Sequence, residues 1–133
     1  MAEQSAYIRS VLGSNPSAPT NHLKMEFKDI IKRAQEIQKT YRTVNKQQRL
    51  KVWGVPEYMQ GFVGDVGDLV KLVMVKENFL QSGNIDRKLA RELSDCLWSV
   101  IIISKELEID LEKEFLATMN ELEKRLHDKQ KKY

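Results

Sequence analysis

The order of apolar and polar positions along the chain predicts four helices. From Leu23 to Val44, apolar residues recur at every third or fourth position, as they do on one side of an amphipathic helix. The segment Cys96–Ile103 has the β-branched composition of a buried strand, but the residues around it keep the helical period. The other helices are expected at about residues 56–80, 86–107 and from 111 onward. The predicted fold class is therefore all-α.

Polar residues mark the expected ends of these helices. Residues 81–84 (QSGN) read as a turn between the second and third helices. The connection at residues 108–110 is short, so the third and fourth helices are expected to pack antiparallel. Side chains that can accept a hydrogen bond from a free N–H at a helix start are Thr20 or Asn21, Asp86 and Asp110.

The domain organisation follows from the turn formers and the apolar surface. Residues 14–21 (SNPSAPTN) favour turns, so we expect residues 1–21 to be a flexible N-terminal arm and residues 22–133 to be a single all-α domain. The second and third predicted helices are apolar around most of their circumference. One short chain cannot cover that surface. We therefore expect a bundle-like, four-helix fold completed by oligomerisation, as a homodimer or homotetramer.

Composition and charge narrow the class of protein. The chain has 22 basic and 19 acidic residues, yet residues 24–51 alone hold nine basic and three acidic ones. Such a segment attracts phosphate groups, but it is too poor in interleaved aromatic residues to favour nucleic acid. No apolar run is long enough to span a membrane, and no secretory signal is visible. The single cysteine, Cys96, is expected to be a buried small hydrophobe in a cytoplasmic protein.

Four carboxylates lie within the most apolar part of the chain. Asp65 and Asp68 stand three residues apart in GFVGDVGDLVKL, and Glu92 and Asp95 stand three apart in RELSDCLW. Residues at this spacing share one face of a helix, so antiparallel packing of the second and third helices would bring both pairs together. Their combined charge needs a compensating cation. An all-oxygen set with no histidine nearby favours Mg²⁺ over zinc or haem.

Two features of these helices have more than one explanation. Instead of a metal, the cations that compensate the acids could be Lys71, Lys88 or Arg91, which stand at helical neighbour spacing. The glycines at 61, 64 and 67 disfavour a helix, which suggests that another backbone or a ligand approaches there; close helix packing is the alternative.

The segments MQGFVGDVGDLVKLVMVKEN and ARELSDCLWSVIIISKELEIDLEKEFLATMNELEKRL resemble the MazG-like nucleoside triphosphate pyrophosphohydrolases of the all-α NTP pyrophosphatase superfamily. The resemblance covers about residues 24–126 and rests on the family's ExxE and ExxD motifs, which lie on successive helices. It implies a MazG-type fold and a house-cleaning hydrolase. The implied reaction is Mg²⁺-dependent hydrolysis of a nucleoside triphosphate to the monophosphate and pyrophosphate, with Mn²⁺ able to substitute.

The family motifs carry over to this chain residue by residue. Asp65 and Asp68 stand where ExxE has its glutamates, and Glu92 and Asp95 match ExxD. All four are thereby expected to be metal ligands. Asp65 and Glu92 are the expected catalytic residues, and Asp65 would take the proton of the attacking water.

Other positions depart from the family pattern. Relatives often have glycine where this chain has Glu108. In some relatives a lysine and an asparagine on the last helix contact the substrate phosphates, and these fall at Thr118 and Leu122 here. Since neither can neutralise phosphate, other cations must do so. The candidates are Lys51, Lys71, Lys76 and Arg91, with Lys71 favoured because it lies one turn beyond Asp68.

Two tryptophans are also candidates for roles near the site. Trp53 precedes the second helix, where relatives similar to deoxycytidine-triphosphate enzymes place a tryptophan near the base. It is expected either to stack on the base or to hold the loop to the core. Trp98 is expected in the core or a subunit interface. Two alternatives to the main function stay open: a helical module that binds a nucleotide or a partner without hydrolysis, and a pyrophosphohydrolase of another nucleotide, such as phosphoribosyl-ATP.

Overall fold

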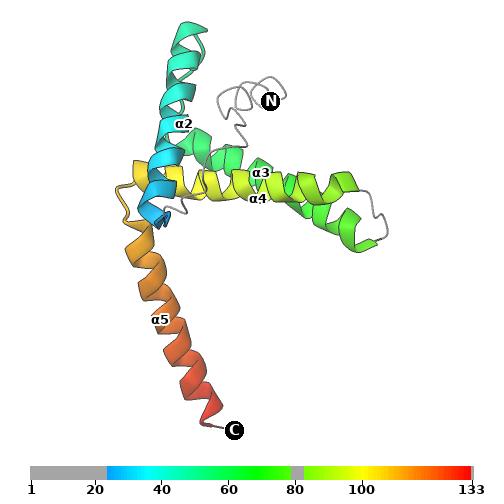
Figure 1. Ribbon diagram of the computed structural model, residues 1–133, viewed down its shortest axis with the longest axis vertical. Coiled ribbons are helices and arrows are strands. Elements are labelled where there is room, and N and C mark those ends of the chain that lie inside the picture. Colours follow the sequence, from blue (N-terminus) through cyan, green and yellow to red (C-terminus); the bar gives the residue numbers. More distant parts are fainter. Residues whose placement is uncertain (1–23, 79–82, 133) are drawn as a thin grey trace.

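The computed structural model describes residues 24–78 and 83–132, which form four helices and no strand. The helices are α2 (Phe27–Gln47), α3 (Val55–Asn78), α4 (Gly83–Glu106) and α5 (Leu111–Gln130) (Figure 1). The all-α prediction is confirmed, and Cys96–Ile103 is helical as expected. The predicted arm at residues 1–21, with its candidate cap residues, lies outside the described part. Within that part, no helix combines the length and the apolar character that a membrane span requires.

The helix starts agree with the prediction at one end of the chain and differ elsewhere. Asp110 caps α5 as expected, because its Oδ1 accepts a hydrogen bond from the backbone N–H of Lys113 at 3.2 Å. The cap predicted at Asp86 is wrong: α4 begins at Gly83, so Asp86 lies within the first turn and pairs with Lys76 of α3. Gly83 and Asn84 are therefore helical rather than part of a turn. Both residues disfavour a helix, but the penalty is small, about 1 kcal/mol for glycine relative to alanine, and packing can override it.

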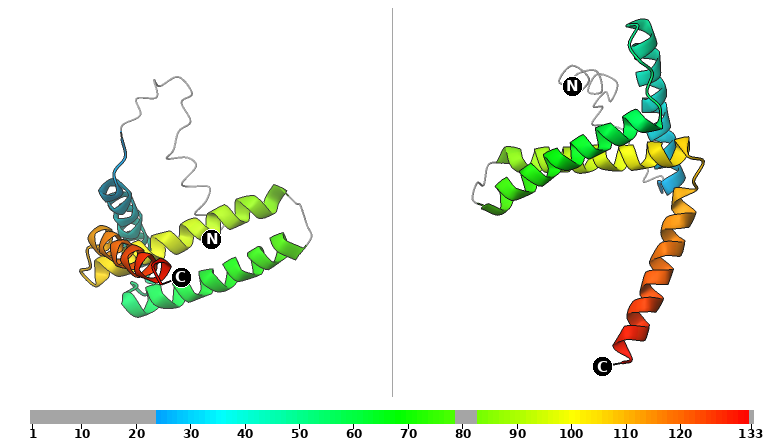
Figure 2. Two further views of the ribbon diagram at one scale, coloured as in Figure 1. Left: turned by 90° about the horizontal axis from the view of Figure 1, so that it is seen from below. Right: turned by 180° about the vertical axis from the view of Figure 1, so that it is seen from behind.

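α3 and α4 form an antiparallel helical hairpin, and α2 crosses the end of the hairpin where α3 begins and α4 ends (Figures 1 and 2). The apolar core of the described residues lies at this crossing and contains Ala34, Tyr58, Ile101 and Ile102. Trp98 packs against the core, and its indole N–H donates to the carbonyl oxygen of Ala34 at 3.1 Å. This contact fixes α2 on α4.

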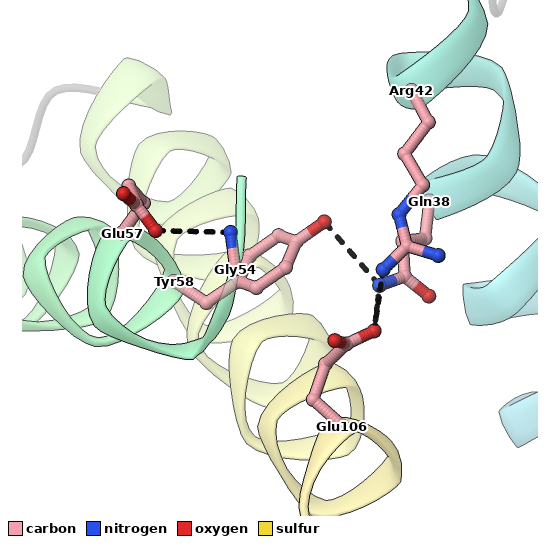
Figure 3. A network of polar contacts seen from close by, with 6 residues as sticks. All are labelled: Gln38, Arg42, Gly54, Glu57, Tyr58 and Glu106. Atoms are coloured by element: carbon pink, nitrogen blue, oxygen red, sulfur yellow. Dashed lines mark hydrogen bonds and ion pairs between the residues drawn. The ribbon is translucent and has the colours of Figure 1, made fainter. Parts of the chain in front are cut away.

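A polar network joins the same three helices beside the core (Figure 3). Gln38 Nε2 donates to Glu106 Oε1 at 2.7 Å and to the hydroxyl oxygen of Tyr58 at 3.3 Å. Arg42 Nη2 donates to the same Glu106 oxygen at 2.6 Å. Gln38 is buried, and leaving such a group without a partner costs about 1–3 kcal/mol. Glu106 therefore links α4 to α2, and Gln38 extends the network to Tyr58 of α3.

α5 leaves α4 instead of packing along it. It runs away from the hairpin (Figures 1 and 2), and none of its residues is buried. The predicted antiparallel packing of the last two helices is therefore wrong in this structure. The connecting turn redirects the chain, because Glu108 adopts a left-handed φ of 57°. Glycine adopts this conformation without the steric cost that a side chain brings.

Candidate functional site

The hairpin brings three of the four predicted acids together. Asp65 and Asp68 of α3 and Glu92 of α4 each offer a carboxylate oxygen, and these oxygens all lie within 4.8 Å of one another. We call these three residues the acid cluster. Asp95 is not one of this set, although its charge raises the pKa of both Asp65 and Glu92. The three-residue spacing on two antiparallel helices accounts for the arrangement.

The surroundings of these acids disfavour their negative charges. Burial raises the pKa of Asp65, and the charges of Asp95 and Asp68 raise it further. Burial also raises the pKa of Glu92, followed by the neighbouring carboxylates, while Arg91 acts in the opposite direction. The pKa of Asp95 is likewise raised by burial. A nearby cation would therefore stabilise the ionised forms.

The surroundings of Glu92 indicate whether a cation would fit the acid cluster. Its Oε2 atom is buried and has no hydrogen-bond partner among the described residues. The protein cations that could compensate the acids are Lys71, Lys88 and Arg91, and none of them forms an ion pair within the described ranges. The donors of the cluster are all carboxylate oxygens, the ligands that hard divalent ions prefer. The residues present therefore fit Mg²⁺.

An aromatic pocket of about 540 Å³ adjoins the acids. Asp65 and Asp95 line it together with four aromatic side chains and the polar groups of Arg42, Asn45 and Ser99. The rings meet edge to face, with centroids 5.7 Å apart for Tyr41–Trp98, 5.6 Å for Trp53–Tyr58 and 6.0 Å for Tyr58–Trp98. Helix α2 supplies Tyr41 and Arg42, so the crossing of α2 over the hairpin creates this pocket.

Trp53 both contacts the body of the protein and lines the aromatic pocket. Its side chain is 43% exposed, and a Cβ added at Gly61 would lie 3.1 Å from its Cζ3 atom. A close neighbour is therefore found at Gly61, but it is the Trp53 side chain and not the backbone that was expected. At Gly64 and Gly67 an added Cβ would meet no atom of the described residues within 4 Å, so the expected approach of another backbone is wrong at those two positions, and the approach of a ligand stays a prediction.

The loop that carries Trp53 is held by Glu57. The backbone N–H of Gly54 donates to Glu57 Oε2 at 2.9 Å (Figure 3), and Lys51 forms an ion pair with the same carboxylate. The hydrogen bond from Lys51 and that from Gly54 lower the pKa of Glu57 to about 2. The charge of Lys51 is thus engaged within the loop. Lys76, another predicted phosphate ligand, is engaged with Asp86.

A second pocket, of about 460 Å³, is lined by three basic side chains that form no ion pair among the described residues. We call it the cationic pocket; it is lined by Leu72, by Lys71, Lys88 and Arg91, and by Asp68, Glu92 and Asp95. Its residues lie nearer to the hairpin turn than those of the aromatic pocket, and Asp95 lines both. Lys71 and Arg91 were predicted as substrate ligands, whereas Lys88 was considered only as an ion-pair partner. Its position four residues before Glu92, on the same helix face, is the signal that could have identified it.

Comparison of the chain with protein-family models, with curated proteins and with solved structures found no match. The family resemblance therefore stays a prediction. Thr118 and Leu122, the positions that the predicted resemblance aligns with phosphate ligands, both lie on α5, which leads away from the hairpin (Figure 1).

Proposed function

We propose that this chain is a MazG-like, Mg²⁺-dependent pyrophosphohydrolase, which converts a nucleoside triphosphate and water to the monophosphate and pyrophosphate. The observation that carries the proposal is the acid cluster, in which three carboxylates each offer an oxygen within 4.8 Å of the others and the buried Glu92 Oε2 has no hydrogen-bond partner among the described residues. Asp65, Asp68 and Glu92 would hold the metal, and Asp95 would complete the set. When bound, Mg²⁺ would neutralise phosphate charge and make the phosphorus more electrophilic.

The chain's own residues would supply proton transfer and orientation. The oxygen of water bonds to the α-phosphorus, the bond from that phosphorus to the α–β bridging oxygen breaks, and pyrophosphate leaves. Asp65 would accept the proton of the water through a carboxylate oxygen that the metal does not occupy. Asp65 also lines the aromatic pocket, so this base would lie next to a nucleoside bound there.

The aromatic pocket is the proposed nucleoside site. Its volume of about 540 Å³ lies in the range of small-molecule sites, and its rings offer faces and edges for stacking. Trp53 is the most accessible candidate, because 43% of its surface is exposed. Arg42, Asn45 and Ser99 supply polar groups that could distinguish one base from another.

A binding module without hydrolysis is the second candidate. The observation that favours it is α5, which carries Thr118 and Leu122 in place of phosphate ligands and lies away from the hairpin. Titration calorimetry with Mg²⁺ and a panel of common and modified nucleoside triphosphates separates the two functions. Binding without any product after long incubation would favour the module.

Substitution of Glu92 tests the proposed hydrolysis directly. Glu92→Gln keeps the size of the side chain but removes a charged ligand, so we expect pyrophosphate release to fall by at least about 100-fold. Circular dichroism should show unchanged helix content. The matched control is Glu114→Gln on exposed α5, which should retain activity. Full pyrophosphate release by Glu92→Gln would contradict the assignment.

We further propose that the chain works as a homo-oligomer. Large apolar side chains are exposed on α5 and along α3, among them Phe115, Met119, Leu126, Val63 and Val70. A second copy would remove this surface from water, at roughly 25 cal/mol for each Å² of apolar area.

A further inference from the structure

The cationic pocket combines positive and negative side chains without joining them in ion pairs. Lys71 comes from α3 and Lys88 and Arg91 come from α4, and all three are exposed. None forms an ion pair among the described residues, although Asp68, Glu92 and Asp95 line the same pocket. By contrast, Lys51 and Lys76 are each engaged by a carboxylate. The three cations of the pocket are therefore available to an anion.

The helical spacing places these charges on one side of α4. Lys88, Glu92 and Asp95 follow one another at intervals of four and three residues, so they share a helix face. Burial raises the pKa of both Glu92 and Asp95, and the charge of the neighbouring Arg91 offsets part of this rise. A ligand in the pocket would meet carboxylates and cations at the same time.

Such mixed charge suits a polyphosphate that arrives with a divalent cation. Carboxylates bind the metal, while ammonium and guanidinium groups donate to phosphate oxygens in charge-assisted hydrogen bonds. The three acids would weaken the binding of a simple anion, and the three cations would weaken the binding of a metal without phosphate. Only a ligand of both signs satisfies the whole lining.

We propose that Lys71, Lys88 and Arg91 bind the two terminal phosphates of the substrate, which leave as pyrophosphate. The inference rests on the proposed function for the identity of the substrate. The order of the pockets along the hairpin sets the polarity: the nucleoside lies in the aromatic pocket near α2, and the terminal phosphates lie nearer the hairpin turn. Asp95 lines both pockets, as expected of a residue at the boundary. In this proposal, residues of α3 and α4 supply all three phosphate ligands, and no ligand from α5 is needed.

Binding of inorganic tripolyphosphate in the presence of Mg²⁺ tests this assignment without relying on turnover. We expect Lys71→Gln, Lys88→Gln and Arg91→Gln each to weaken its affinity in titration calorimetry by roughly tenfold or more, because each removes a charge-assisted hydrogen bond. The matched control is Lys105→Gln, an exposed lysine of α4 outside the pocket, which should change affinity less than about twofold. Binding of Mn²⁺ alone, followed by electron paramagnetic resonance, should not weaken in any variant.

The outcomes separate this inference from the proposed function. If the three variants bind tripolyphosphate as the parent chain does, or if the parent does not bind it, the phosphate assignment is overturned even where hydrolysis is observed. If the variants lose binding while the parent releases no pyrophosphate from any triphosphate, the phosphate assignment is supported and the proposed hydrolysis is contradicted.

Discussion

At the scale of single residues, Gly61 controls where the Trp53 ring can lie. An alanine in a helix gains about 0.5–1 kcal/mol over glycine, but at this position its Cβ would lie 3.1 Å from the ring. We expect Gly61→Ala to raise the KM for the nucleoside triphosphate several-fold with little change in kcat, because the displaced ring stacks less well. Gly64→Ala is the control. Its Cβ meets open space, so it should stabilise the chain towards urea and leave KM unchanged. Equal kinetics in the two variants would show that Trp53 does not contact substrate.

Asp65 makes the stability of the metal-free chain depend on pH. Its folded pKa lies above the ordinary 3.8, so the stability that it contributes is fully present below that pH and is lost as the pH rises through the folded pKa. Without divalent ions, Asp65→Asn should therefore melt at a higher temperature than the parent at pH 8, and the difference should shrink towards pH 4. Saturating Mg²⁺ should stabilise the parent more than the variant. Scanning calorimetry with and without chelator measures both effects; a difference independent of pH would contradict the explanation.

At the scale of the helices, Glu106 connects α2 to the hairpin and supports the wall of the aromatic pocket. Truncation in Glu106→Ala leaves buried Gln38 and the Arg42 guanidinium without this carboxylate. We expect a loss of about 1–2 kcal/mol in the free energy of unfolding, at the lower end of the cost of breaking a buried charged contact because Arg42 is partly exposed. Urea denaturation followed by circular dichroism measures this loss. Glu123→Ala, an exposed change on α5, should have little effect, and similar stability of the two variants would exclude the connecting role.

The helices differ in how far local sequence determines them. The period of apolar residues and the cap at Asp110 are local signals, and the structure agrees with both. The start of α4 depends on a contact with α3, and the direction of α5 depends on one backbone dihedral angle. Asp86 forms an ion pair with Lys76 across the hairpin. Glu108 adopts a left-handed φ of 57°, and its residue type does not predict this conformation. Such tertiary choices are invisible to propensity and spacing.

At the scale of the whole molecule, one part of the candidate site follows from local sequence and another part does not. The acid cluster could be predicted, because three-residue spacing on two antiparallel helices fixes which side chains meet. The aromatic pocket could not, because it needs Tyr41 of α2 to reach Trp98 of α4. In the sequence Tyr41 is only one member of an apolar stripe. The crossing of α2 over the hairpin is what turns it into part of a pocket.

The shape of the whole molecule leads to a prediction about its assembly. Beyond Leu111, which packs against the core, the large apolar side chains of α5 are exposed: Phe115 is 57% exposed and Leu126 is 61% exposed. Analytical ultracentrifugation should therefore detect a dimer or tetramer rather than the 15.5 kDa monomer. Leu122→Asp places a charge on the same stripe and should weaken association at least about tenfold, whereas Glu123→Lys on the neighbouring position should leave it unchanged. A parent chain that sediments only as a monomer would mean that α5 does not bind a second copy, and its apolar face would then need a different partner.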